Sequence, residues 1–161
     1  METRRILTRI PPQNTDSEKS LLGSILLSPG VMVKVSQIIK PSAFYKEQHT
    51  IIYMSILEMY IEKREIDIIT LSDNLRNKNQ LDKIGGMSYL AELASTVPTA
   101  SNSEHYAVII QDKYSRRQLI QLSEKIANAA YDETVKMKDA LQRTQKALKE
   151  VEKISIGMLH S

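Results

Sequence analysis

Residues 103–131 read SEHYAVIIQDKYSRRQLIQLSEKIANAAY and contain neither glycine nor proline. Apolar residues in the second half of this segment recur at intervals of three and four, which aligns their side chains along one face of an α-helix: Leu119, Leu122, Ile126 and Ala129. The segment therefore predicts one continuous helix, with Asn102 as a candidate N-cap. At about 1.5 Å per residue the helix is roughly 43 Å long, which is more than a small globular core needs. We expect it to extend beyond such a core.

A second apolar stripe follows a short break at residues 132–134. Its members again step by three and four residues: Met137, Leu141, Thr144, Leu148 and Val151. Both stripes are typical of coiled-coil seams. Because the break is short, the two helices are expected to form an antiparallel hairpin. Two helices alone bury such stripes incompletely, so we expect a second copy of the chain to cover six residues: Leu119, Leu122, Ile126, Leu141, Leu148 and Val151.

The sequence before residue 102 predicts shorter helices separated by proline and glycine. The first is expected over residues 16–27, because Thr15 and Glu18 have the spacing of a capping box. Ser28 and Pro29 then have the pattern of a helix start, and this second helix is expected to end before Pro41. These two helices open a helical head that we expect over residues 14–101, after an extended arm over residues 1–13.

The rest of the expected head contains a central helix and two short ones. A wide stripe with Ile52, Ile56 and Tyr60 predicts the central helix over residues 46–63. Thr70 and Asp73 have cap spacing for a helix over residues 70–78. Another short helix is expected over residues 87–95, after the glycine pair 85–86. The hairpin then occupies residues 102–155, and residues 156–161 are expected to begin an interdomain linker.

The composition agrees with an all-α protein. The 161 residues include only five glycines and five prolines, few for a chain of many strands and turns. Cysteine is absent, which excludes disulfides, thiolate metal sites and a cysteine nucleophile. The sequence has no membrane-length apolar run and no apolar signal core, so we expect a cytoplasmic protein without a membrane segment.

No sequence pattern indicates catalysis by this chain. The glycines do not form a phosphate-binding G-x-x-x-x-G-K-[ST] motif, so no nucleotide cofactor is expected. His49, His105 and His160 are isolated from one another, which disfavours a metal site. Asp67 and Asp73 are the nearest candidates for an acid and base pair, but we assign Asp67 to a turn and Asp73 to a helix cap.

The excess positive charge lies in the last third of the chain. Residues 1–110 contain 12 Lys or Arg and 12 Asp or Glu, whereas residues 111–161 contain 10 and 7. Basic residues on the hairpin leave a small helical DNA-binding regulator as one alternative. Acidic residues are interspersed among them and aromatic stacking residues are not, which favours a solvated helix face.

A series of short motifs runs from about residue 10 to residue 155. They are Pro11-Pro12-Gln13-Asn14 with Glu18, Leu22-Gly23-Ser24-Ile25-Leu26, Phe44-Tyr45 with His49 and Ile52-Tyr53, Asp67-Ile68-Ile69-Thr70-Leu71, Leu81 with Gly85-Gly86, Tyr89-Leu90 and Leu93, Val97-Pro98-Thr99-Ala100 with Asn102, Tyr106-Ala107, and Arg116-Arg117-Gln118-Leu119-Ile120. In order and spacing this series resembles the N-terminal domain of bacterial DnaB-type replicative DNA helicases.

The resemblance implies a domain that assembles and docks rather than one that catalyses. In that family the hairpins pair, and three pairs form the collar of a hexameric ring around single-stranded DNA. The collar receives the C-terminal domain of primase and in some lineages a helicase loader, while ATP and Mg belong to a following motor domain. That motor domain is missing here, so we expect an excised piece of a helicase. The alternative is a free-standing adaptor that binds a helicase or primase without a motor.

The residues expected to dock a partner are those that the fold leaves available. Asp16 favours the dipole of its helix without being the cap. Tyr89 lies on a short helix whose buried side Leu90 and Leu93 already supply. Two hairpin residues complete the candidates, although the second also belongs to the expected self-association stripe: Ile120 and Ile126.

Overall fold

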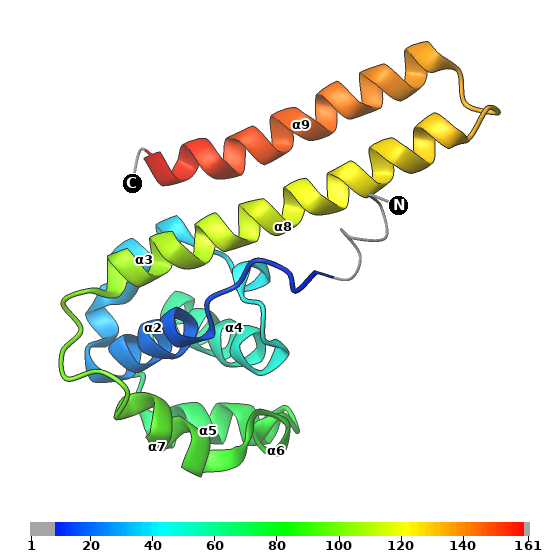
Figure 1. Ribbon diagram of the computed structural model, residues 1–161. Coiled ribbons are helices and arrows are strands. Elements are labelled where there is room, and N and C mark those ends of the chain that lie inside the picture. The colour runs from blue at the N-terminus through cyan, green and yellow to red at the C-terminus, as the bar shows by residue number, and fades with distance from the viewer. Residues whose placement is uncertain (1–8, 160–161) are drawn as a thin grey trace. The chain divides into compact units, whose positions relative to one another are not determined.

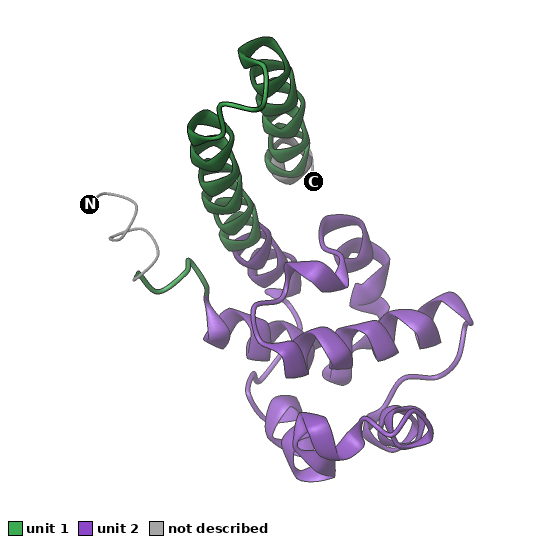
Figure 2. Ribbon diagram, turned by 90° about the vertical axis from the view of Figure 1, so that its right-hand side faces the viewer, with its two compact units in different colours: residues 1–13, 112–161 green, residues 14–111 purple. Residues whose placement is uncertain are grey.

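The computed structural model describes residues 9–159, with side chains described up to residue 155. Within these residues the chain forms helices and no strand, so the all-α prediction is confirmed. Figure 2 shows two compact units: unit 1 comprises residues 1–13 and 112–161, and unit 2 comprises residues 14–111. The first boundary of unit 2 lies at Asn14. The second lies inside the long helix rather than at its start.

The helices follow one another without intervening strands in the described residues (Figure 1). In chain order they are α2 (Thr15–Leu27), η1 (Pro29–Val31), α3 (Met32–Ile38), η2 (Pro41–Ala43), α4 (Glu47–Ile61), α5 (Ile68–Asn77), α6 (Leu81–Ile84), α7 (Gly86–Ala94), α8 (Ser103–Tyr131) and α9 (Met137–Leu159).

The core of unit 2 lies between α2, α4 and α7. The expected stripe of the central helix is its centre, because Ile52, Ile56 and Met59 are 0% exposed. Leu21 and Leu22 on α2 and Leu90 and Leu93 on α7 are also fully buried. Tyr60, which was expected in the same stripe, is only partly buried.

A glycine allows α2 and α7 to approach closely. A Cβ atom built on Gly23 would lie 2.2 Å from the carbonyl oxygen of Leu93, far inside van der Waals contact. Only a residue without a side chain therefore fits at this crossing. The close approach positions α7, which carries Tyr89, beside α2, which carries Glu18.

Two expected helix caps are wrong. The N-cap of α2 is Asn14, whose side chain accepts a hydrogen bond from the Ser17 amide at 2.9 Å, and not Thr15. The N-cap of α5 is Asp67, which forms a reciprocal capping box with Thr70, so Asp67 is not merely a turn residue and Asp73 is not the capping partner. The helices consequently begin at Thr15 and Ile68.

The start of the second helix differs in detail from the prediction. Ser28 and Pro29 occupy the expected positions, but Pro29–Val31 is a 3-10 turn and the α-helix begins at Met32. The Ser28 side chain makes no capping hydrogen bond in the part of the chain that the structure describes.

Unit 1 contains the antiparallel pair formed by residues 112–131 of α8 and by α9. Figures 1 and 2 show α9 running back alongside α8, as the two apolar stripes predicted. In the connection the Asp132 side chain accepts hydrogen bonds from the Thr134 hydroxyl and, at 3.0 Å, from the Thr134 amide. The hydroxyl first and the amide second lower the pKa of Asp132. Helix α9 continues to Leu159 and so covers most of the expected linker. The rest of that linker, residues 160–161, and residues 1–8 of the arm lie outside the described residues.

No single helix in the described range 9–159 is long and apolar enough to cross a membrane. The segments Thr15–Leu27 and Pro29–Ile38, which meet at a sharp bend, reach that length and apolar content only when they are taken together.

Candidate protein-interaction site

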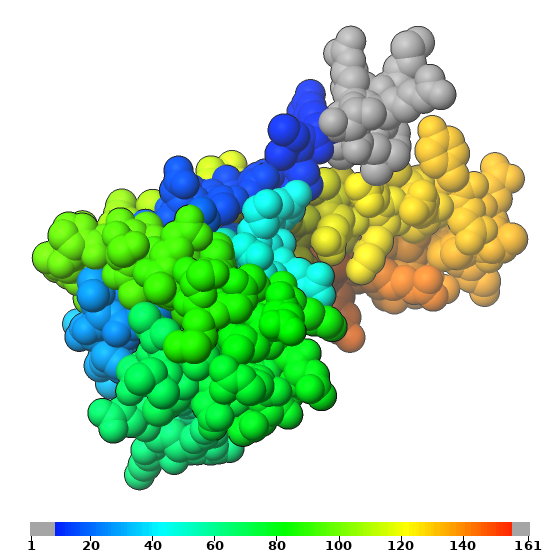
Figure 3. Space-filling model, turned by 90° about the horizontal axis from the view of Figure 1, so that it is seen from below, coloured from blue at the N-terminus to red at the C-terminus, as the bar shows by residue number. Residues whose placement is uncertain are grey.

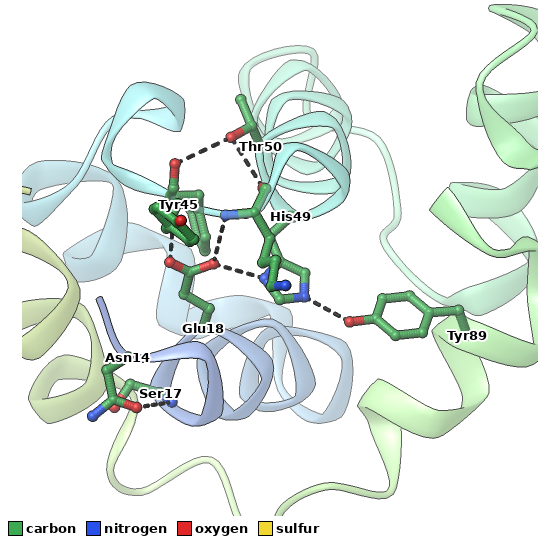
Figure 4. Close-up of polar contacts among 9 residues, drawn as sticks. Asn14, Ser17, Glu18, Tyr45, His49, Thr50 and Tyr89 are labelled. Atoms are coloured by element: carbon green, nitrogen blue, oxygen red, sulfur yellow. Dashed lines mark hydrogen bonds and ion pairs between the residues drawn. The ribbon is translucent and has the colours of Figure 1, made fainter. Parts of the chain in front are cut away.

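A buried carboxylate connects α2 to the start of α4. The Glu18 side chain accepts hydrogen bonds from the amides of Tyr45 at 2.8 Å and Lys46 at 3.3 Å, and its Oε1 lies 2.7 Å from Nδ1 of His49. Lys46, the N-cap of α4, contributes no side-chain cap. Glu18 therefore satisfies amides at the start of α4 from another helix. The prediction that Glu18 completes its own helix cap is wrong, because its carboxylate points to α4 (Figure 4).

His49 extends this contact to α7. Its side chain is fully buried, and its Nε2 lies 2.6 Å from the Tyr89 hydroxyl. The two rings meet edge to edge, with centroids 6.0 Å apart and planes 13° from parallel. A carboxylate only accepts hydrogen bonds, so the geometry assigns a proton to Nδ1 and, in the neutral ring, leaves Nε2 to accept from Tyr89. Figure 4 shows Glu18, His49 and Tyr89 as one chain of contacts.

The Tyr89 hydroxyl is suited to act as the donor. Burial is the main cause that raises its pKa, and the charges of Glu92 and Glu18 raise it further, while a side-chain hydrogen bond with Gln48 lowers it. Because the net pKa is above the ordinary value, the phenol keeps its proton at neutral pH.

Gly85, immediately before α7, makes room for Tyr89. Gly85 has φ 106° and Gly86 has φ 72°, a region that side chains disfavour. A Cβ atom on Gly85 would lie 2.9 Å from Cβ of Tyr89. Helices α5, α6 and α7 form the face of unit 2 that Figure 3 presents.

The four docking candidates have different surroundings. Asp16 is exposed in the first turn of α2, as expected. Tyr89 is only partly exposed, and the expectation that the fold does not use it is wrong for its hydroxyl, which His49 engages. Both residues belong to unit 2, whereas Ile120 and Ile126 belong to unit 1. Their role in docking stays a prediction.

In unit 1, Ile120 borders a groove and Ile126 is part of the apolar stripe. The groove has a volume of about 500 Å³ and lies between α8 and residues 9–12. Arg117 donates to the carbonyl oxygen of Pro12 at 2.8 Å and so holds the arm on α8. Ile126 is 40% exposed.

Most of the self-association candidates are exposed. The exposed fractions are 50% for Leu119, 55% for Leu141 and 42% for Leu148, and Val151 is partly buried. Leu122 is only 6% exposed and lines small cavities between α8 and α9. The expectation that a second copy covers Leu122 is therefore wrong for this residue, because α9 already does so.

The three histidines were considered in the sequence analysis as metal ligands. His49 contacts a carboxylate and a phenol, and His105 is exposed, while His160 lies outside the described residues. Among the side chains that the structure describes, no group of three or more His, Cys, Asp or Glu is arranged to hold a metal ion.

Residues 10–112 match the family model described as the DnaB-like helicase N-terminal domain. The chain is 36% identical over 143 residues to the replicative DNA helicase DnaC of Bacillus subtilis and, over the same length, to the replicative DNA helicase DnaB of Geobacillus stearothermophilus. These alignments cover 89% of this chain and 32% of each relative, so the chain spans about a third of their length.

Solved structures show the same fold. The N-terminal domain of DnaB helicase from Mycobacterium tuberculosis has a TM-score of 0.83 and 32% identity, over 88% of this chain and 99% of that one. A DnaB-like replicative helicase, described together with its interactions with primase, has a TM-score of 0.72 and 23% identity, over 86% of this chain and 31% of that one. On the family model and these relatives, the chain belongs to the family of DnaB-like helicase N-terminal domains.

Proposed function

We propose that this chain is the non-catalytic collar domain of a replicative DNA helicase, which joins subunits through its hairpin and docks primase at the replication fork. ATP and Mg belong in this proposal to a motor domain outside the sequence, because the chain has no phosphate-binding glycine motif. A replication role would place the domain in the cytoplasm. Family membership supports the proposal in outline.

The observation that carries the assembly role is the exposed apolar stripe on the hairpin. Leu119, Ile126, Leu141 and Leu148 are each at least 40% exposed. They recur with coiled-coil spacing on both helices, which suits a partner that is itself helical. A second copy of the hairpin presents the same stripe and can cover it in a two-fold arrangement. We propose that such dimers associate in threes to form the collar through which single-stranded DNA passes.

Light scattering across a concentration series tests this assembly. The wild-type mass is expected to rise to multiples of 18.3 kDa, whereas Leu148→Glu is expected to remain a folded single chain. Gln142→Glu is the matched control, because it adds the same charge to an exposed residue on another face of α9. A Leu148→Glu protein with the wild-type mass at every concentration would exclude the hairpin stripe as the interface.

The partner that we propose for docking is the C-terminal domain of primase. A helicase loader is a further candidate partner. Support comes from the structural neighbour described with its interactions with primase. We assign Asp16 and Tyr89 to this surface on unit 2, and Ile120 and Ile126 to the part on unit 1. A partly exposed tyrosine is a common interface anchor, so Tyr89→Ala is expected to weaken primase binding at least about fivefold, or roughly 1 kcal/mol.

Calorimetric titration against the primase C-terminal domain measures this effect. The melting curve of the same protein is the control, because a purely structural Tyr89 predicts a lower melting temperature and unchanged affinity of the folded fraction. Unchanged affinity would remove Tyr89 from the docking surface.

A further inference from the structure

Glu18, His49 and Tyr89 form a polar chain that starts in the interior and ends at the surface of unit 2. The side chain of Glu18 is 2% exposed and that of His49 is 0% exposed, while Tyr89 is partly exposed. Capping the start of α4 requires only the hydrogen bonds that Glu18 accepts from the amides of Tyr45 and Lys46. The second nitrogen of His49 and the Tyr89 hydroxyl are not needed for that cap. Buried polar groups are costly unless they are fully hydrogen-bonded, so an apolar pair would serve packing alone equally well.

We propose that His49, oriented by Glu18, is a positioning residue that holds Tyr89 in the orientation that primase meets. This inference rests on the proposed docking function and names the residues that prepare its surface.

In the series Glu18, His49 and Tyr89, each contact restricts the orientation of the next side chain. Two backbone amides fix the Glu18 carboxylate, and the carboxylate fixes the ring of His49 through Nδ1. Nε2 of His49 then holds the hydroxyl of Tyr89 and so fixes the outer end of its side chain. A side chain that is already ordered loses less freedom on binding, which strengthens the complex without adding a contact.

Two substitutions of His49 distinguish its contact with Glu18 from its contact with Tyr89. In His49→Asn the amide nitrogen occupies the place of Nδ1, so the contact with Glu18 is kept and the contact with Tyr89 is lost. In His49→Gln the amide group reaches the place of Nε2, so the contact with Tyr89 is restored. Tyr89→Phe removes only the hydroxyl and keeps the ring.

The first measurement is primase affinity by calorimetric titration, with a melting curve for each variant. His49→Asn and Tyr89→Phe are each expected to weaken binding by about twofold to tenfold, the effect of leaving one interface side chain unordered. The double variant is expected to bind no more weakly than either single variant, because both changes break the same contact. His49→Gln is expected to recover most of the affinity.

The second measurement is the ¹⁵N NMR spectrum of the histidine rings, which does not depend on primase. His49 is expected to show a protonated Nδ1 and an unprotonated Nε2, and the Nε2 signal is expected to shift in Tyr89→Phe. The spectrum of His49→Asn assigns the signal. A protonated Nε2 in the neutral ring, or an Nε2 signal indifferent to Tyr89→Phe, would overturn the inference.

The outcomes distinguish this inference from the function on which it rests. If the wild type binds primase and folded His49→Asn binds equally well, or if the two single effects add, the inference fails and the docking function stands. If the wild type does not bind primase, the docking function fails and the inference fails with it.

Discussion

Replacing Gly23 by alanine is expected to destabilise unit 2 by forcing α2 and α7 apart. The new Cβ atom would lie 2.2 Å from the Leu93 carbonyl oxygen and 3.3 Å from its carbonyl carbon. Carbon and oxygen ordinarily approach to about 3.3 Å, so the helices must separate by roughly 1 Å. Both obstructing atoms are backbone, which no change of rotamer relieves.

The expected magnitude is a difference between two effects. Overfilling a packed site typically costs about 1–3 kcal/mol. Alanine is itself better than glycine in a helix by about 0.5–1 kcal/mol. The net destabilisation of Gly23→Ala is therefore about 0–2.5 kcal/mol, with a central value of about 1 kcal/mol. For a unit of this size the melting temperature is expected to fall by roughly 4–8 °C for each kcal/mol.

Gly30→Ala is the matched control. A Cβ atom on Gly30 meets nothing within 4 Å, and its backbone is not in the left-handed region. This variant is expected to be neutral or to gain about 0.4–1 kcal/mol, because alanine has less freedom in the unfolded chain. Urea and thermal denaturation monitored by circular dichroism measure both variants. A Gly23→Ala protein as stable as Gly30→Ala would refute the close helix crossing.

Three further predictions concern a cap, the core and the hairpin. Asp67→Ala is expected to lower the free energy of unfolding by about 1 kcal/mol and Asp73→Ala by much less, because only Asp67 belongs to a capping box. Urea denaturation measures both variants, and a larger loss in Asp73→Ala would identify Asp73 as the cap instead. Ile56→Ala is expected to cost about 2–5 kcal/mol, since its side chain is 0% exposed; a melting temperature within a degree or two of wild type contradicts this placement of the core. Leu122→Glu is expected to reduce helicity and to lower the melting temperature more than Leu148→Glu, because the two residues are 6% and 42% exposed. Equal circular dichroism spectra and melting curves of the two variants would argue against this difference in burial.

The long helices could be predicted because their determinants are local. The interval of three and four residues in α8 repeats whatever the chain packs against, and glycine and proline are absent from residues 103–131. The ends of this helix were accordingly predicted where the structure has them. The buried stripe of α4 followed from the same periodicity.

The helix caps were harder to predict because several neighbouring residues have side chains that can cap. Asn14 and Thr15 are both competent, and so are Asp67 and Thr70 at the start of α5. The backbone angles decide among them, and these depend on how the preceding loop is held. Glu18 in addition had a second use, since the amides at the start of α4 compete for the same carboxylate.

The sequence by itself determined the helices, the hairpin and the family resemblance, since each depends on residues close together in the chain. Only the tertiary structure decided that Glu18, His49 and Tyr89 meet. Glu18 and His49 are 31 residues apart in sequence, and His49 and Tyr89 are 40 apart. No local periodicity carries information over such separations. The contact exists because Gly23 lets α7 approach α2 and because the turn at Gly85 directs Tyr89 toward α4, and both conditions arise only when the helices pack.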